Sequence, residues 1–227
     1  MAAFVQGRGA FSEGAVASIA LAFAGAVTAG NDLVVGASQD AVWSIVFTDS
    51  ETNSYTDDID NSDSGISSGL SHSFDVGAAS ITVTATPDGE DYVTIGILEF
   101  SGLDSYDTGD SAVEGYDTTI SVTFTTNYAD VCVSYASNPY SLGVWVSGPT
   151  GYEEVYEGDS GGNNFGTSLY YKIQESSGEE TPAVEWTSDG KGSMCGGGYQ
   201  VAAAPAAGQP YFKRFGGVPH SITYRRW

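Results

Sequence analysis

One five-residue segment of the sequence could carry nucleophilic chemistry. Gly158–Gly162 reads GDSGG and also fits G-x-S-x-G, which would make Ser160 a nucleophile. Such a serine needs a His base that a carboxylate orients, and His72 with Asp104 or Asp110 is formally available. The context does not fit, because His72 lies in LSHSF, no Cys directly precedes the motif, no Pro directly follows it, and no strand–turn–helix surrounds it. We therefore predict a surface turn, no catalytic residue and no enzyme activity.

Carboxylates are dense between residues 49 and 63, where they could coordinate Ca²⁺. The segment departs from an EF-hand loop, since it lacks the Gly at the sixth position and the Glu at the twelfth. A solvated acidic loop is the expectation, with a Ca²⁺ site as the alternative. Zinc is not expected, because His72 and His220 have no CxxC or HxxxH partners, so we predict no metal and no cofactor. The acidic residues of this loop are Asp49, Glu51, Asp57, Asp58, Asp60 and Asp63.

Two glutamates in strand-like patterns raise the question of glycoside hydrolysis, which uses a pair of carboxylates. Glu99 lies in ILEFS and Glu185 in AVEWT. A glucanase-like sandwich carries two or three acidic residues that alternate along one strand, and no strand pattern in this sequence does so. We therefore do not assign a catalytic pair.

Aromatic residues gather late in the sequence, where packing between two sheets is the expectation and a platform on which sugars stack is the alternative. Cys132 lies in an alternating pattern and Cys195 in a Gly-rich stretch. This favours two buried thiols over a single bridge. The aromatic residues in question are Tyr135, Tyr140, Trp145, Tyr152, Tyr156, Tyr170 and Tyr171.

Charge is distributed unevenly along the 227 residues, which include 29 acidic and 7 basic side chains. Every acidic residue precedes position 209; residues 1–208 hold 29 acidic and three basic residues, a net −26. Residues 209–227 hold four basic residues and no acidic one, a net +4. A body this acidic repels polyphosphate, so we expect no nucleic-acid partner. No apolar run reaches the roughly 18 residues of a membrane span, so we expect no membrane partner.

Short segments of period two, separated by turn residues, predict that the chain is all-β, and no stretch keeps a helical period over two turns. Residues 15–29 could pass for the apolar part of a signal peptide, but Ile19, Leu21 and Phe23 alternate with alanines, which favours a strand. The fold class that we predict is a jelly-roll-like antiparallel β-sandwich with an extended C-terminal arm. The predicted strands are 16–23, 32–37, 42–48, 70–76, 79–85, 92–100, 119–126, 130–136, 142–147, 167–174, 183–187 and 198–203.

Three segments follow from these patterns. Residues 1–203 are expected to form one β-sandwich domain, residues 204–210 an Ala/Pro linker, and residues 211–227 a basic aromatic assembly arm. Aromatic and Arg side chains are the types that dominate protein interfaces. The interface residues predicted in the arm are Tyr211, Phe212, Lys213, Arg214, Phe215, Tyr224, Arg225, Arg226 and Trp227.

The segments FVQGRGAFSEGAV (4–16) and ILEFSGLD (97–104) resemble a widespread β-sandwich family of tailed-phage structural proteins and uncharacterised bacterial proteins. KRFGGVPHSITYRRW (213–227) resembles tails of phage virion proteins. The resemblance implies a virion component and transfers no active site.

We therefore expect a structural protein on the virion exterior, made in the host cytoplasm, that binds its own copies and other virion proteins such as the major capsid or tail protein. Capsid decoration or cement is the first expectation. The alternatives are a tail- or fibre-associated protein and a carbohydrate-binding module for a host-surface glycan.

Overall fold

The computed structural model describes residues 1–42, 44–61, 65–138, 145–159 and 166–203. These residues form strands and turns and no helix, so none of them belongs to a helix that could cross a membrane. All strand pairs are antiparallel, which confirms the predicted all-β, jelly-roll-like sandwich class. The linker (204–210) and the arm (211–227) lie outside the described residues, and the single domain expected over 1–203 stays a prediction.

The first half of the chain forms two sheets. One has the strand order β1-β8-β3-β6-β5 and the other has the order β2-β7-β4. The first strand pairs with the eighth, the second with the seventh and the third with the sixth, as in a jelly roll. The strands are β1 (Ala3–Phe11), β2 (Ile19–Ala22), β3 (Asp32–Gln39), β4 (Val46–Asp49), β5 (Thr56–Asp60), β6 (Ser67–Ser73), β7 (Thr82–Thr86) and β8 (Val93–Ser101).

The second half repeats this pairing. Its main sheet has the order β9-β16-β11-β14-β13, and β10 pairs with β15. β9 and β16 are 19 residues long, so the start of β16 lies between the end of β9 and β12, just as β7 lies between β2 and β4. The strands are β9 (Leu103–Ser121), β10 (Phe124–Thr126), β11 (Asp130–Asn138), β12 (Trp145–Ser147), β13 (Glu153–Asp159), β14 (Gly166–Ile173), β15 (Gly178–Glu180) and β16 (Ala183–Val201).

The register of the two halves also corresponds. Gly36 pairs with Gly96 and Leu70 in the first half, and Tyr135 pairs with Cys195 and Leu169 in the second. Each residue of the first half is separated from its counterpart in the second half by the same number of residues along the chain. The chain therefore contains an internal structural repeat that the sequence analysis did not detect.

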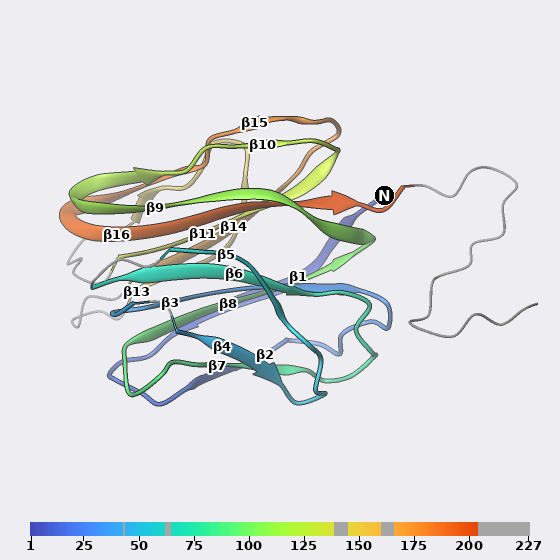
Figure 1. Cartoon of the computed structure of the whole chain (residues 1–227), viewed down its shortest axis with the longest axis horizontal. Helices are drawn as coiled ribbons and strands as arrows, with labels where there is room; N and C mark the ends of the chain where they lie inside the picture. The colour runs from blue at the N-terminus through green and yellow to red at the C-terminus, as the bar shows by residue number, and fades with distance from the viewer. Residues whose placement is uncertain (43, 62–64, 139–144, 160–165, 204–227) are drawn as a thin grey trace, which may run out of the picture.

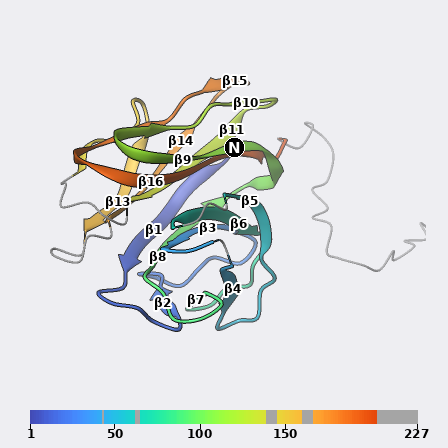
Figure 2. The ribbon, with the colours of Figure 1, turned by 60° about the vertical axis from the view of Figure 1, so that its left-hand side comes forward.

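The sheets stack as four layers, with the two large sheets face to face in the middle (Figure 1). The turned view of Figure 2 shows the same stacking, with β2, β7 and β4 at one outer side and β10 and β15 at the other. Separate apolar clusters fill the spaces within each half and between the halves. β3 and β11 are buried along their whole length because each lies in a sheet that is covered on both faces.

Local sequence explains the outer layers. In β7, TVTAT, Val83 and Ala85 are buried while Thr82 and Thr84 are partly exposed. This alternation is typical of an antiparallel sheet with one wet face. Residues 19–22 also form a strand, with Leu21 in the core, as the alternating pattern predicted.

Several strands differ from the sequence expectation. β1, β13 and β15 were not predicted, and most of β9 was not either. β5 lies inside the segment 49–63, which we expected to be a solvated acidic loop. Its sequence, TDDID, holds three acidic residues and does not indicate a strand, but it pairs with β6. The GDSGG segment was predicted to be a turn, but its first two residues end β13, and residues 160–162 lie outside the described part of the chain.

The contact between the halves centres on Tyr135, which is fully buried. A Cβ atom placed on Gly36 would lie 2.8 Å from Cδ2 of this ring, and one on Gly96 would lie 2.9 Å from its Cε2. The ring of the second half therefore occupies the space that two glycines leave open in the sheet of the first half. Its hydroxyl hydrogen-bonds to Thr94, which in turn bonds Ser38 at 2.7 Å, so the polar end of the ring is satisfied.

A second tie joins the halves at the chain junction. The buried carboxylate of Asp32 accepts hydrogen bonds from the backbone N–H of Leu103, at 2.9 Å, and of Asp75, at 3.0 Å. Leu103 is the first residue of β9, so a residue of β3 fixes the point at which the second half begins.

Gly36→Ala is expected to lower the free energy of unfolding by about 1–3 kcal/mol, because the added methyl group collides with a fully buried ring. Gly77→Ala is the matched control, since a Cβ there meets nothing within 4 Å, and it should change stability by less than about 0.5 kcal/mol. Urea unfolding of the full chain measures both values. Equal stability of the two variants would show that the Tyr135 ring does not lie on Gly36.

Candidate functional site

The structure does not assemble the serine-nucleophile arrangement that we weighed and rejected from the sequence, as far as its residues are described. Gly158 pairs with Thr167 on β14, and Ser160 lies outside the described residues. The carboxylate that contacts His72 is Asp58, with 2.5 Å between Nδ1 and Oδ1, and not Asp104 or Asp110.

Asp58 and His72 belong to a buried network that spans both halves of the molecule. The Asp58 side chain is 2% exposed and that of His72 is 13% exposed. Tyr199, on β16 of the second half, donates its hydroxyl hydrogen to Oδ2 of Asp58 at 3.0 Å. Burial raises the pKa of Asp58, and the hydrogen bonds from His72 and Tyr199 oppose the rise. Among the described residues, no hydroxyl or thiol hydrogen-bonds to His72, so this network is a polar tie between the halves.

Two other carboxylates of the acidic loop, Asp49 and Asp57, have local partners. Asp49 accepts hydrogen bonds from the backbone N–H groups of Glu51 and Asn53 and from the Tyr55 hydroxyl. Asp57 accepts one from Ser71. In the described part of the chain, no three His, Cys, Asp or Glu side chains lie close enough together to hold a metal ion. Asp63 lies outside that part.

The two glutamates considered for glycoside hydrolysis lie in different environments. Glu99 is fully buried and accepts hydrogen bonds from Gln6 and Asn31, each at 2.6 Å, and from the Thr28 N–H at 2.9 Å. Glu185 is exposed on the start of β16. Glu99 lies in the first half and Glu185 in the second, and Glu99 anchors the chain around residues 28–31.

Packing accounts for most of the aromatic residues singled out from the sequence. Tyr171 stacks on Phe4 with ring centroids 4.4 Å apart, and Trp145 packs edge-on against Trp186 with centroids 5.6 Å apart. The hydroxyl of Tyr152 hydrogen-bonds to Glu180, that of Tyr170 to Glu157, and Tyr156 is partly buried against the core between the halves. Tyr140 lies outside the described residues.

Both cysteines are buried free thiols, as the sequence favoured. Burial raises the pKa of Cys195 to about 12, and it also raises the pKa of Cys132. Neither thiol is therefore an activated nucleophile.

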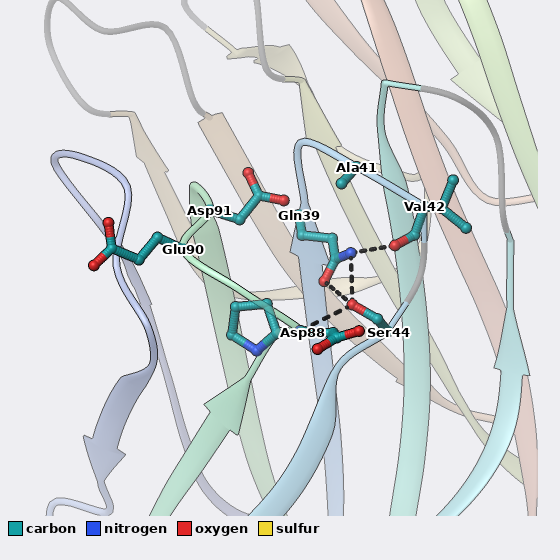
Figure 3. A pocket seen from close by; sticks show the side chains of 8 residues that line it. Gln39, Ala41, Val42, Ser44, Asp88, Glu90 and Asp91 are labelled. Carbon is teal, nitrogen blue, oxygen red and sulfur yellow. Dashed lines mark hydrogen bonds between the residues drawn. The ribbon is translucent and has the colours of Figure 1, made fainter.

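An acidic pocket of about 460 Å³ opens where β3 ends (Figure 3). Asp88, Glu90 and Asp91 line one part of it, and Gln39 forms another, with its amide hydrogen-bonded to Ser44 at 3.1 Å and to the Val42 carbonyl. The described lining contains no His, Cys, Lys or Arg. The pocket is therefore anionic, and carboxylates are the only ionisable side chains in its described lining.

Two neighbouring carboxylates, Asp130 and Asp107, lie inside the second half. Asp130, at the start of β11, is fully buried, and neither of its carboxylate oxygens has a hydrogen-bond donor among the described residues. Asp107 lies beside it and is the extra residue of a bulge in β9. Its carboxylate accepts a hydrogen bond from the backbone N–H of Asn127. Burial, and then the contact with Asp107, raise the pKa of Asp130 to about 7. Only below that pH is the pair relieved of charge repulsion.

Comparison with known proteins gives no relative for this chain. No family model, no curated protein and no solved structure matches it.

Acidification should stabilise the protein between about pH 7 and pH 4 through Asp130. Its pKa is about 7 in the folded state against 3.8 for the free group, so the folded state binds the extra proton and stability falls as pH rises through this window. Asp130→Asn removes the charge, and should raise the midpoint of thermal unfolding at pH 7.5 by roughly 3–6 °C.

The variant should also show a flatter dependence of the unfolding midpoint on pH than the natural protein. Asp104→Asn, at an exposed position of β9, is the control for the loss of one negative charge and should shift the midpoint by less than about 2 °C. Parallel pH profiles of the natural protein and Asp130→Asn would show that Asp130 does not titrate in this window.

Proposed function

We propose that this protein is a structural component of a tailed-phage virion, displayed on the particle exterior as a capsid decoration or cement protein and tethered by residues 211–227. Its partners are then copies of itself and the major capsid or tail protein. A tail- or fibre-associated position is the alternative within the same class.

The observation that carries the proposal is the division of charge along the chain. Every acidic residue precedes position 209, and the last 19 residues add four basic and five aromatic side chains without an acidic one. Such a segment suits docking on an acidic protein surface, where opposite charge speeds encounter and aromatic side chains supply binding energy.

The double sandwich fits this role. An apolar cluster fills the space between its two large sheets, and hydrogen bonds from Leu103 and Tyr199 link the two halves. The body is therefore one block, as a structural role requires. A body with a net charge of −26 is repelled by packaged DNA, which favours a position outside the shell. The resemblance of residues 4–16, 97–104 and 213–227 to phage structural proteins points the same way.

Mass spectrometry and imaging of purified particles that carry a tagged copy test the proposal. We expect the tag on the outer surface, in hundreds of copies for a decoration protein or a handful for a tail protein. Deleting residues 211–227 should reduce incorporation at least about tenfold, because the tether is lost. Full incorporation of the truncated protein, or a tag found inside the shell, would contradict the proposal.

A host-glycan-binding module is the second candidate from the sequence. Tyr171, Trp145 and Tyr152 contact other side chains of the protein, so none of these three is an open platform for a sugar ring. Glycan-array binding would distinguish it from a structural role.

A further inference from the structure

β16 finishes beside the N-terminus at one end of the molecule (Figure 1). An apolar groove opens between these two segments and their neighbours. Its volume is about 690 Å³, within the range of about 300–1,000 Å³ that proteins use to bury ligand groups. Its lining comes from the start of the chain (Ala2), from the turn between β10 and β11 (Tyr128), from the end of β14 and the residues after it (Ile173 and Glu175), and from the end of β16 and the residues after it (Val201 and Ala203).

The groove exposes apolar side chains that the rest of the fold does not cover. Tyr128 is 50% exposed and Ile173 is 42% exposed, and both are among the few large apolar residues exposed in the described structure. Glu175 is the single charged side chain of the described lining. An exposed apolar patch with an acidic edge is typical of a protein-binding surface.

Backbone hydrogen bonds hold the walls of the groove in place. Gln174 donates its N–H to the Asp130 carbonyl at 2.8 Å, and Val201 donates to the Ala129 carbonyl at 3.2 Å. Ala202 donates to the Gly102 carbonyl at 2.8 Å. Because its walls are fixed, the groove can accept a ligand without the cost of ordering a loop.

The chain itself supplies a segment of matching chemistry. Ala203 lines the groove, and the 24 residues that follow it hold five aromatic and four basic side chains and no acidic one. These are the groups that an apolar groove on an acidic body would bind.

The linker composition favours a groove on a second copy over the groove from which the arm starts. Pro205 and Pro210 favour an extended chain over residues 204–210, at roughly 3.1 Å per residue. Seven residues of such a linker are expected to span about 20 Å, a length suited to reaching a second copy rather than the groove beside Ala203.

We propose that the groove between Tyr128 and Ile173 is the docking site for the aromatic arm, residues 211–227, of a second copy of this chain. The inference rests on the proposed function, in which the arm mediates assembly, and it names the receiving surface. The aromatic side chains of the arm fill the groove, and one of its basic side chains pairs with Glu175 at the edge.

Complementation between two full-length variants tests this docking. Ile173→Asp places a charge in the groove but keeps the arm, and a variant with Phe212→Ala and Trp227→Ala weakens the arm but keeps the groove. In sedimentation velocity, the natural protein should associate as its concentration rises, and each variant alone should do so at least about tenfold more weakly. An equimolar mixture of the two variants should form a one-to-one dimer, because one intact arm then meets one intact groove.

Two controls keep the outcome interpretable. Val46→Asp places the same charge at a residue that is 61% exposed on β4, away from the groove, and should associate like the natural protein. Tyr128→Ser is a second groove variant, to be used if Ile173→Asp shows a lower melting temperature. A mixture that stays monomeric, or natural protein that stays monomeric at every concentration, would overturn the proposal.

The two proposals can fail separately. A dimer from the mixed variants, in a protein absent from purified particles, would refute the virion role and leave the groove assignment standing. Abundant incorporation into particles, with no complementation in solution, would refute the groove assignment and leave the virion role.

Discussion

The structure depends on one contact, the seating of the Tyr135 ring on Gly36 and Gly96. Two sheets that each complete a jelly-roll-like sandwich can pack face to face only if their facing side chains interlock. The missing side chains of the two glycines leave the space for the ring, and Thr94 satisfies its hydroxyl. Around this contact, the apolar cluster between the two large sheets joins the two sandwiches into one block of four layers.

The polar ties follow from this arrangement. Once the large sheets face each other, carboxylates on their inner faces lose water and require partners from the opposite half. Asp58 contacts His72 of its own half and accepts a hydrogen bond from Tyr199 of the other half, and Asp32 accepts one from the Leu103 N–H. Asp130 lies inside the second half instead, where its carboxylate has no hydrogen-bond partner among the described residues and burial raises its pKa to about 7.

Sequence reasoning recovered the strands whose apolar residues alternate or run together, such as β3, β7 and β8. It missed the strand character of most of β9, because the Asp and Gly residues of DTGDSAVEGYD resemble a turn, and pairing with β16 imposes the extended form. The internal repeat escaped notice for a physical reason. At the contact between the halves, Gly36 corresponds to Tyr135, so equivalent positions of β3 and β11 carry the smallest residue and a large aromatic one.

The site residues predicted in the arm lie outside the described part of the chain, and the groove that we assign to them could not be predicted from sequence. It is formed by four chain segments that meet only in the fold, and none of them carries a motif. Tyr128 falls between two predicted strands and is half exposed, whereas Tyr135 and Tyr199 fall inside predicted strands and are buried, but such a position alone does not indicate a groove.

A density map of the assembled protein, by electron cryo-microscopy at side-chain resolution, tests the central claim most directly. The account predicts density for residues 211–227 of one copy between Tyr128 and Ile173 of its neighbour. An empty groove in an ordered assembly, or density for the arm on another surface, would contradict it.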